Sequence, residues 1–439
     1  MGILSSLTRE QKEAVGLLQI GTFLEYFDLM LYVHMAVLLN ELFFPKTDPH
    51  TAALLTAFAF CSTWVFRPFG ALIFGYIGDH IGRKTTVIIT TMMMSISCII
   101  MANLPTYAQI GISAAWIVTG CRIFQGLSSM GEIMGAMVYV MEITKFPVQY
   151  SAVAFIGVAS SLGAVAALGI SVLVTSYEGN WRIAFWIGAS IAVMGSIART
   201  RLRETPDFIN AKKRIKKDSI DQKKASIKTP KKNILSGFLI QCGWPLSFYI
   251  AYMHFNPILK SDYGYSPEDI ILHNFLLSIV LLLINIFWAT LSYKIHPLKI
   301  IKLKAKVFCL IILSFPFFLS HISHQYQIFI LQSFLLIVSL GANPADAVII
   351  KSIPILKRVT ITSFVYALAR SVMYVITSFG LIYLSDLFGN YGILIIVLPV
   401  AIGFIFGVHH LEKLEKASGN FPEYRVSEHL LQMTKKIKR

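Results

Sequence analysis

The chain of 439 residues has little charge and lacks the patterns of several enzyme classes. Only 14% of its residues are charged, against roughly 25% in a typical soluble domain. Its five cysteines show no C-x-x-C spacing, which argues against a zinc site or a disulfide framework. No phosphate-binding loop, dinucleotide fingerprint or Ser-His-Asp arrangement stands in a plausible context. We therefore expect no enzyme activity, no cofactor and no metal site.

Long apolar segments dominate the chain instead. About 20 apolar residues are enough for a helix to cross the hydrocarbon core of a bilayer. Twelve stretches reach about this length, at 14–39, 51–78, 85–104, 108–134, 150–175, 182–200, 234–259, 269–292, 305–321, 325–349, 360–385 and 390–409. The first is not a cleavable signal, because it carries Glu25 and Asp28 and has no small-residue cleavage site. The sequence therefore predicts an all-α membrane protein with twelve transmembrane helices.

The net charge of +16 gathers on one predicted side of the membrane. Nearly all Lys and Arg residues fall in the two tails and in the loops on the side of the termini. The outer loops hold Lys46, Arg182 and Lys260. This asymmetry places both termini in the cytoplasm. It also explains the basic composition without nucleic acid, because basic cytoplasmic loops attract anionic lipid headgroups.

The polar, Lys-rich stretch 201–233 divides the apolar segments into two groups of six. We predict an N-terminal six-helix bundle at 1–200, a cytoplasmic linker at 201–233, a C-terminal six-helix bundle at 234–409 and a cytoplasmic tail at 410–439. In secondary transporters, such halves enclose a central cavity near the middle of the membrane.

A charged, glycine-rich turn separates the second and third apolar segments, at 75–86. Glycines allow two helices to approach closely in lipid, and a polar turn must lie outside the hydrocarbon. The turn resembles the loop 2–3 signature of the major facilitator superfamily, and the resemblance implies a cytoplasmic gate in which Asp79 and Arg83 stabilise the outward-facing state. The gate residues are Gly75, Gly78, Asp79, Gly82, Arg83 and Lys84.

Ionisable residues inside the apolar segments are costly and mark functional sites. Gly21, Glu25, Asp28 and Tyr32 follow one another at helical spacing and share one face of the first segment. Two carboxylates on one face suit a site that couples protons or recognises a cation, because their proximity raises the pKa of at least one. The alternative is that these acids only neutralise arginines.

Three arginines and a further acid lie in other apolar segments. They are Arg67, Arg122, Glu132 and Arg370. Arg122 and Glu132 are ten residues apart on one segment, too distant to pair directly. Arg370 is the natural partner of an acid on the first helix, and it could instead bind a substrate carboxylate with two hydrogen bonds.

Several motifs resemble those of the metabolite:proton symporter family within the major facilitator superfamily. The turn at 75–86 resembles the loop 2–3 signature of the superfamily, and 122–126 (Arg-Ile-Phe-Gln-Gly) resembles its helix 4 motif. Within the symporter family, the resemblance rests on 23–32, 66–70, 180–185 and 203–208. It is strong over roughly 16–208, weaker beyond, and greatest to the proline/betaine transporters.

Two loops depart from the family pattern. Loop 4–5 reads Pro147-Val148-Gln149-Tyr150, where the family has basic residues and glycine. In loop 8–9, Tyr293 and His296 stand where a second copy of the signature would have Asp and Gly. These departures predict an altered gate on the cytoplasmic side.

The resemblance implies proton-coupled uptake of a small zwitterion, such as proline or a betaine, by alternating access. Protonation of Glu25, Asp28 or Glu132 would shift the balance between the outward- and inward-open states. We expect a monomer in the bacterial inner membrane whose partners are the solute, protons and lipid. The alternatives are a proton symporter of an organic acid and a non-transporting membrane receptor or scaffold that retains the fold.

Overall fold

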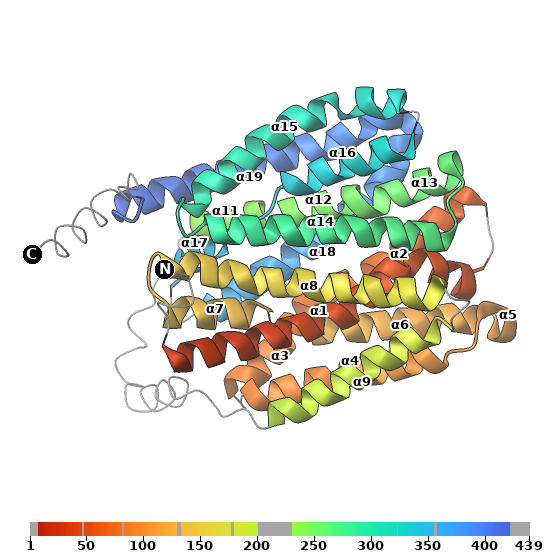
Figure 1. Ribbon diagram of the computed structural model, residues 1–439, viewed down its shortest axis with the longest axis horizontal. Coiled ribbons are helices and arrows are strands. Elements are labelled where there is room, and N and C mark those ends of the chain that lie inside the picture. Colours follow the sequence, from red (N-terminus) through yellow and green to blue (C-terminus); the bar gives the residue numbers. More distant parts are fainter. Residues whose placement is uncertain are drawn as a thin grey trace, which may run out of the picture.

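The computed structural model describes residues 8–45, 48–80, 83–129, 133–176, 180–200, 231–322, 324–354 and 358–421. The described part is built of helices joined by short turns, without strands (Figure 1). In lipid, a helix satisfies its backbone hydrogen bonds internally, which suits the long apolar segments of this chain. Within the described residues, seven helical stretches are long and apolar enough to cross a membrane by themselves.

The first half of the chain forms nine helical elements. They are α1 (Arg9–Phe43), α2 (Pro49–Val65), α3 (Arg67–His80), α4 (Arg83–Asn103), α5 (Tyr107–Ile110), α6 (Ile112–Ser128), α7 (Ile133–Ile143), α8 (Val148–Ser176) and α9 (Arg182–Thr200). Helix α1 begins at a capping box, because Thr8 and Gln11 each hydrogen-bond the backbone N–H of the other. The second predicted span is broken between α2 and α3, next to Pro68, which has no backbone N–H to donate.

The second half contains more interruptions. Its elements are α11 (Lys231–Gln241), α12 (Gly243–Phe248), the π-helical turn η2 (Tyr249–His254), α13 (Phe255–Tyr263), α14 (Pro267–Leu291), α15 (Pro297–His321), α16 (Gln325–Ile337), α17 (Asp346–Lys351), α18 (Arg358–Phe388), the 3₁₀ turn η4 (Gly389–Tyr391) and α19 (Gly392–Ala417). Between α16 and α17 the chain leaves the helix over 338–345.

Every predicted span coincides with a helix or a chain of helices, and four boundaries need correction. The fourth span continues through α7 to Ile143, beyond 134. The ninth helix begins at Pro297 rather than near 305, because His296 caps it through its side chain. The tenth ends at Ile337, well before 349. The twelfth continues to Ala417, beyond 409. The proposed linker lies almost wholly outside the described residues, so the division into domains stays a prediction.

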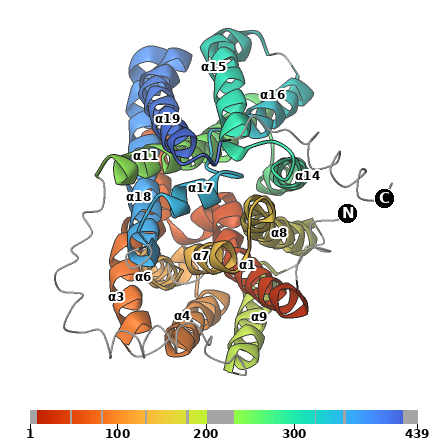
Figure 2. The same cartoon turned by 90° about the vertical axis from the view of Figure 1, so that its left-hand side faces the viewer.

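The helices run side by side along one axis. The start of α1, the end of α9, the start of α11 and the end of α19 lie at the same end of the bundle, on the left of Figure 1. Viewed from that end, α11, α15, α16 and α19 gather on one side and α3, α4, α6 and α9 on the other (Figure 2). The first and second halves of the chain meet where α8 packs on α14 and where α2 and α3 pack on α18.

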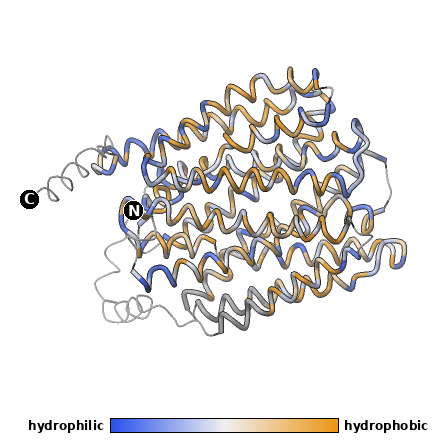
Figure 3. The backbone as a smooth tube through the Cα atoms, viewed as in Figure 1, coloured by the Kyte–Doolittle hydropathy of each residue, from blue (hydrophilic) through white to orange (hydrophobic). Residues whose placement is uncertain are grey.

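Apolar residues predominate along the middle of the helices, and polar residues concentrate toward both ends (Figure 3). Large apolar side chains such as Ile96, Leu310 and Ile402 are exposed there. An apolar band of this kind is what a bilayer covers, since lipid tails do not penalise its exposure.

Glycines allow some helices in the first half to touch backbone to backbone. A Cβ atom added at Gly126 of α6 would collide with the carbonyl oxygen of Thr63 on α2. A Cβ atom at Gly163 of α8 would collide with the carbonyl oxygen of Phe23 on α1. These contacts agree with the role of small residues in membrane helix packing.

Candidate functional site: a cavity between the two halves

A cavity of about 110 Å³ lies between the two halves. Its walls come from α1, α2, α7 and α8 of the first half and from six elements of the second, α11, α12, α14, α15, α17 and α18, together with the turn η2 and the stretch 338–345. One water molecule needs roughly 10–15 Å³ of cavity volume, so this cavity has room for a small solute.

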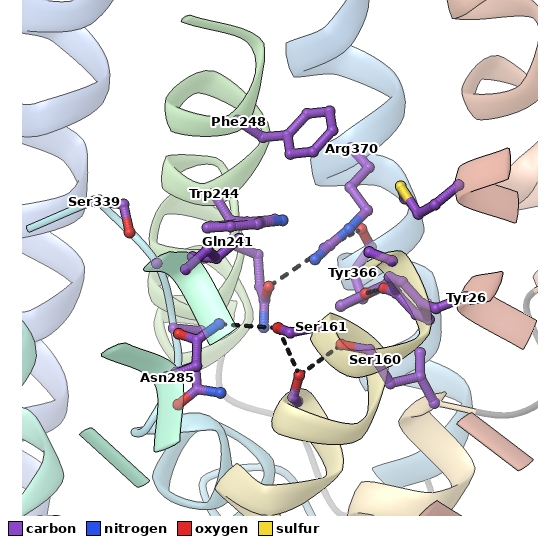
Figure 4. Close-up of a pocket in the computed structure, with 18 of the residues that line it drawn as sticks. Tyr26, Ser160, Ser161, Gln241, Trp244, Phe248, Asn285, Ser339, Tyr366 and Arg370 are labelled. Carbon is purple, nitrogen blue, oxygen red and sulfur yellow. Dashed lines mark hydrogen bonds between the residues drawn. The ribbon is translucent and has the colours of Figure 1, made fainter. Parts of the chain in front are cut away.

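A chain of hydrogen bonds crosses the cavity from α17 to α1. Gln241 donates from Nε2 to Oδ1 of Asp346 at 3.2 Å and accepts at Oε1 from Nη1 of Arg370 at 3.5 Å. The Arg370 guanidinium lies 3.3 Å from the centroid of the Tyr366 ring. The hydroxyl of Tyr366 is 2.7 Å from the hydroxyl of Tyr26 on α1. Figure 4 shows Arg370, Gln241, Tyr366 and Tyr26 converging on the same space.

Lys304 contributes a second cation to the cavity wall. It lies on α15, its residue is only 5% exposed, and its charge acts on Asp346. The predicted span 305–321 leaves it in the preceding cytoplasmic loop, which is wrong because α15 begins at Pro297. The cavity is therefore lined by the charged residues Arg370, Lys304 and Asp346.

Aromatic side chains form one wall of the cavity. Trp244, Phe248 and Tyr252 follow at spacings of four along α12 and η2. The Trp244 and Phe248 rings have centroids 6.1 Å apart, and those of Phe248 and Tyr252 are 5.0 Å apart. Tyr374 of α18 extends this aromatic wall, because its ring centroid lies 6.3 Å from that of Phe248. Such faces attract organic cations.

Uncharged polar groups line the region next to Gln241. Asn285 of α14 donates from Nδ2 to the hydroxyl of Ser161 on α8 at 2.9 Å, which joins the two halves (Figure 4). Ser160 and Ser161 donate to the carbonyl oxygen of Gly157. These groups are small and neutral, so the charge of the cavity is set by the three ionisable residues named above. His34 also lines the cavity.

Of the predicted site residues, Arg370 lines the cavity. The predicted face of α1, which carries Glu25 and Asp28, does not line it. The adjacent face of the same helix, which carries Tyr26, Met30 and His34, lines the cavity instead. Glu25 is buried beside the cavity, and its charge acts on Tyr26 and Arg67.

Asp28, Tyr32 and Arg122 face the interior of the first half. A Cβ atom at Gly188 of α9 would lie 3.2 Å from Oδ1 of Asp28. The Arg122 guanidinium lies 4.2 Å from the Tyr32 ring centroid and donates to Oε1 of Gln125 at 2.9 Å. The structure therefore separates these residues from the cavity, and their roles stay predictions.

Arg67 is buried at the start of α3, with its guanidinium 3.9 Å from the ring centroid of Trp64, a cavity residue. Glu132 and Gly82 lie outside the described residues. So do the side chains of Asp79, Arg83 and Lys84, although α3 includes Gly75, Gly78 and Asp79, and α4 begins at Arg83. Helix α3 thus ends at His80 and α4 begins at Arg83, and the gate contacts predicted there stay a prediction.

The two halves are joined at both ends of the cavity. At the end where α1 begins, Tyr150 contacts His296, Ser151 contacts Ser292 and Glu142 pairs with Arg358. At the other end, Glu41 pairs with Lys260 and His50 with Asp386. Contacts at both ends suit a carrier whose cavity opens to one side at a time.

Asp346 and Gln241 are cavity residues that sequence reasoning missed. Asp346 lies inside the predicted span 325–349, and the preceding Ala342-Asn343-Pro344-Ala345 contains a proline. A hydrophobic segment interrupted by proline points to a broken helix of the kind that forms binding sites in membrane carriers. That signal was available. Gln241 has no comparable signature.

The sequence model of the Major Facilitator Superfamily matches residues 18–381. The chain belongs to this superfamily. This family and the curated relatives of the chain are transporters rather than enzymes.

Two relatives indicate where within the superfamily the chain lies. It is 32% identical over 204 residues to the proline/betaine transporter of Salmonella typhimurium, a match covering 45% of this chain and 41% of that protein. It is 32% identical over 241 residues to the inner membrane metabolite transport protein YhjE of Escherichia coli, covering 53% of this chain and 54% of that protein. The matches thus span about half of each relative or less. They agree with the predicted family resemblance.

Solved structures confirm the fold class. A double-tryptophan mutant of XylE superimposes with a TM-score of 0.75 at 13% identity, over 94% of this chain and 96% of that chain. The human organic anion transporter MFSD10 does so with a TM-score of 0.63 at 15% identity, over 92% and 100%. The all-α major facilitator fold is therefore the fold of this chain.

Proposed function

We propose that this chain is a proton-coupled symporter that takes up a small zwitterion, such as proline or a betaine, by alternating access. The observation that carries the proposal is the position of Arg370, a buried cation in the cavity, near the aromatic wall of Trp244, Phe248 and Tyr252. The guanidinium would bind the carboxylate of the solute. The ring faces would hold its ammonium group, including a quaternary one that has no N–H to donate.

The names of two relatives support the same class of solute, since both are called proline/betaine transporters. Protons would enter through one of the buried acids, and the sequence predicts Glu25, Asp28 or Glu132 for this task. We further propose that the protein acts as a monomer in a bacterial inner membrane with both termini in the cytoplasm.

A second candidate function is proton symport of an organic acid. It is favoured by Lys304, because a second cation in the same cavity could bind a second carboxylate. The carboxylate of Asp346 in the same cavity favours the first candidate, since its negative charge offsets part of the charge of the two cations.

The test is substrate counterflow in proteoliposomes that contain the purified protein. The probes are L-proline and glycine betaine, with L-prolinamide and choline as matched compounds lacking the carboxylate, and succinate as a dicarboxylate. We expect counterflow with at least one zwitterion, none with its carboxylate-free analogue, and loss of counterflow in Arg370→Lys, which cannot form the same paired hydrogen bonds. Counterflow of succinate alone would favour the second candidate. No counterflow with any probe would contradict transport of these solutes.

A further inference from the structure

We infer that Asp346 is the carboxylate whose protonation couples solute uptake to the proton gradient. This inference rests on the proposed function of the same cavity. It assigns the coupling step to a residue of the second half rather than to the acids of α1. Asp346 is the first residue of α17 and directly follows the non-helical stretch 338–345.

The surroundings of Asp346 give the first argument. Its residue is only 5% exposed, it lines the cavity, and it accepts a hydrogen bond from Gln241 at 3.2 Å. Arg370 of α18 and Lys304 of α15 are the cations that act on it. From α7 and α8, which also pack against α17, the cavity receives apolar side chains and the neutral Ser160 and Ser161. The other titratable lining groups are His34 and the tyrosines.

The position of Gln241 gives the second argument. One end of its amide donates to Asp346 and the other accepts from Arg370, so the carboxylate and the guanidinium are linked through one side chain. The guanidinium is also the proposed ligand of the solute carboxylate. An ionised Asp346 and a solute carboxylate therefore compete for the same two cations, since both carry negative charge into one small cavity.

Protonation removes this competition. When Asp346 takes a proton from the water on the outer side, Arg370 and Lys304 lose their fixed counter-charge and attract the solute carboxylate more strongly. By linkage, a bound solute carboxylate stabilises the protonated form of Asp346 to the same degree. The proton and the solute therefore load together. Release of the proton to the inner side restores the charge on Asp346, which weakens the hold of the cavity on the solute.

The broken helix suits Asp346 to this step. The chain is non-helical over 338–345 and Asp346 is the first residue of α17, so it does not sit in the middle of a regular helix. Interrupted helices of this kind form the substrate and ion sites of many secondary transporters. Ser339, Ala342 and Asn343 from the same break also line the cavity.

The experiment compares Asp346→Asn with Glu25→Gln, Asp28→Asn and the exposed control Asp262→Asn. Each protein is reconstituted, and two quantities are measured with L-proline and glycine betaine: counterflow, and accumulation driven by an inward proton gradient. We expect Asp346→Asn to keep counterflow and to lose accumulation, so that the internal concentration no longer exceeds the external one. Exchange survives because it does not require the empty carrier to reorient. Asp262→Asn should keep both activities.

A binding measurement on the unmodified protein guards against a variant that does not fold. We expect both probes to bind more tightly as the pH falls, and this dependence to vanish in Asp346→Asn. Accumulation by Asp346→Asn equal to that of the unmodified protein would overturn the inference, as would pH-independent binding by the unmodified protein. Loss of accumulation in an α1 variant alone would return the coupling step to α1. If the unmodified protein shows no counterflow, the proposed function itself fails.

Discussion

The hydroxyl of Tyr150 lies 3.4 Å from Nε2 of His296, and the two residues belong to opposite halves of the bundle. Their rings meet edge to face, with centroids 5.3 Å apart. Both positions depart from the family pattern that the sequence resembles. The two departures from the family pattern therefore contact each other directly. They join the two halves at the end of the cavity where α1 begins.

Removing this contact should open that end of the cavity. A neutral hydrogen bond contributes about 0.5–1.5 kcal/mol, so Tyr150→Phe should raise the inward-open population by about two- to tenfold. Spin labels on the two halves would report the change as a longer distance. Tyr326→Phe, which alters an exposed tyrosine at the other end of the bundle, is the control. Unchanged distance distributions would show that the contact has no role in gating.

The ion pair between Glu142 and Arg358 should act at the same end. Their Oε1 and Nη1 atoms lie 3.1 Å apart, and the Glu142 side chain is 46% exposed, so the pair should contribute no more than about 1 kcal/mol. We expect Glu142→Arg and Arg358→Glu each to slow counterflow, and the double variant to recover part of the rate. A double variant as slow as the worse single variant would indicate that the charges do not interact.

Close helix packing makes a prediction about stability that is independent of transport. Gly126→Ala should lower the unfolding temperature, because the added methyl group meets the backbone of Thr63, and overpacking costs about 1–3 kcal/mol. Gly120→Ala lies on the same helix, and no heavy atom outside the helix's own backbone lies within 4 Å of the added group. A thermal unfolding series in detergent compares the two. Equal unfolding temperatures would contradict the described contact between α2 and α6.

Labelling of introduced cysteines tests the proposed orientation. The exposed residues Ser418 and Ser261 lie at opposite ends of the bundle. In a background without the native cysteines, we expect an impermeant thiol reagent added to intact cells to modify Ser261→Cys and to spare Ser418→Cys until the cells are opened. The reverse pattern would invert the topology.

Much of the fold follows from the sequence because apolar length alone defines a membrane span. Arg370 was found for the same reason, since a lone cation in an apolar segment is conspicuous. The face of α1 was not predictable, because the stripe of Glu25 and the stripe of Tyr26 differ by about 100° of rotation. Only packing against the other half decides which of them reaches the cavity. Lys304 was misplaced because the capping role of His296 moves the helix start upstream.

The π-helical turn η2 bears on the changes in chain length that the protein can tolerate. The ring of Phe248 before this turn and that of Tyr252 within it have centroids 5.0 Å apart. A π-helical turn closes its hydrogen bonds over five residues rather than four, so it holds one residue more than a regular α-helix that covers nearly the same rotation. Deleting one residue from 249–254 would therefore restore regular α-helix and leave α13, with Lys260 beside Glu41, nearly in place. Gaps of a single residue in this stretch should accordingly occur in an alignment of close relatives.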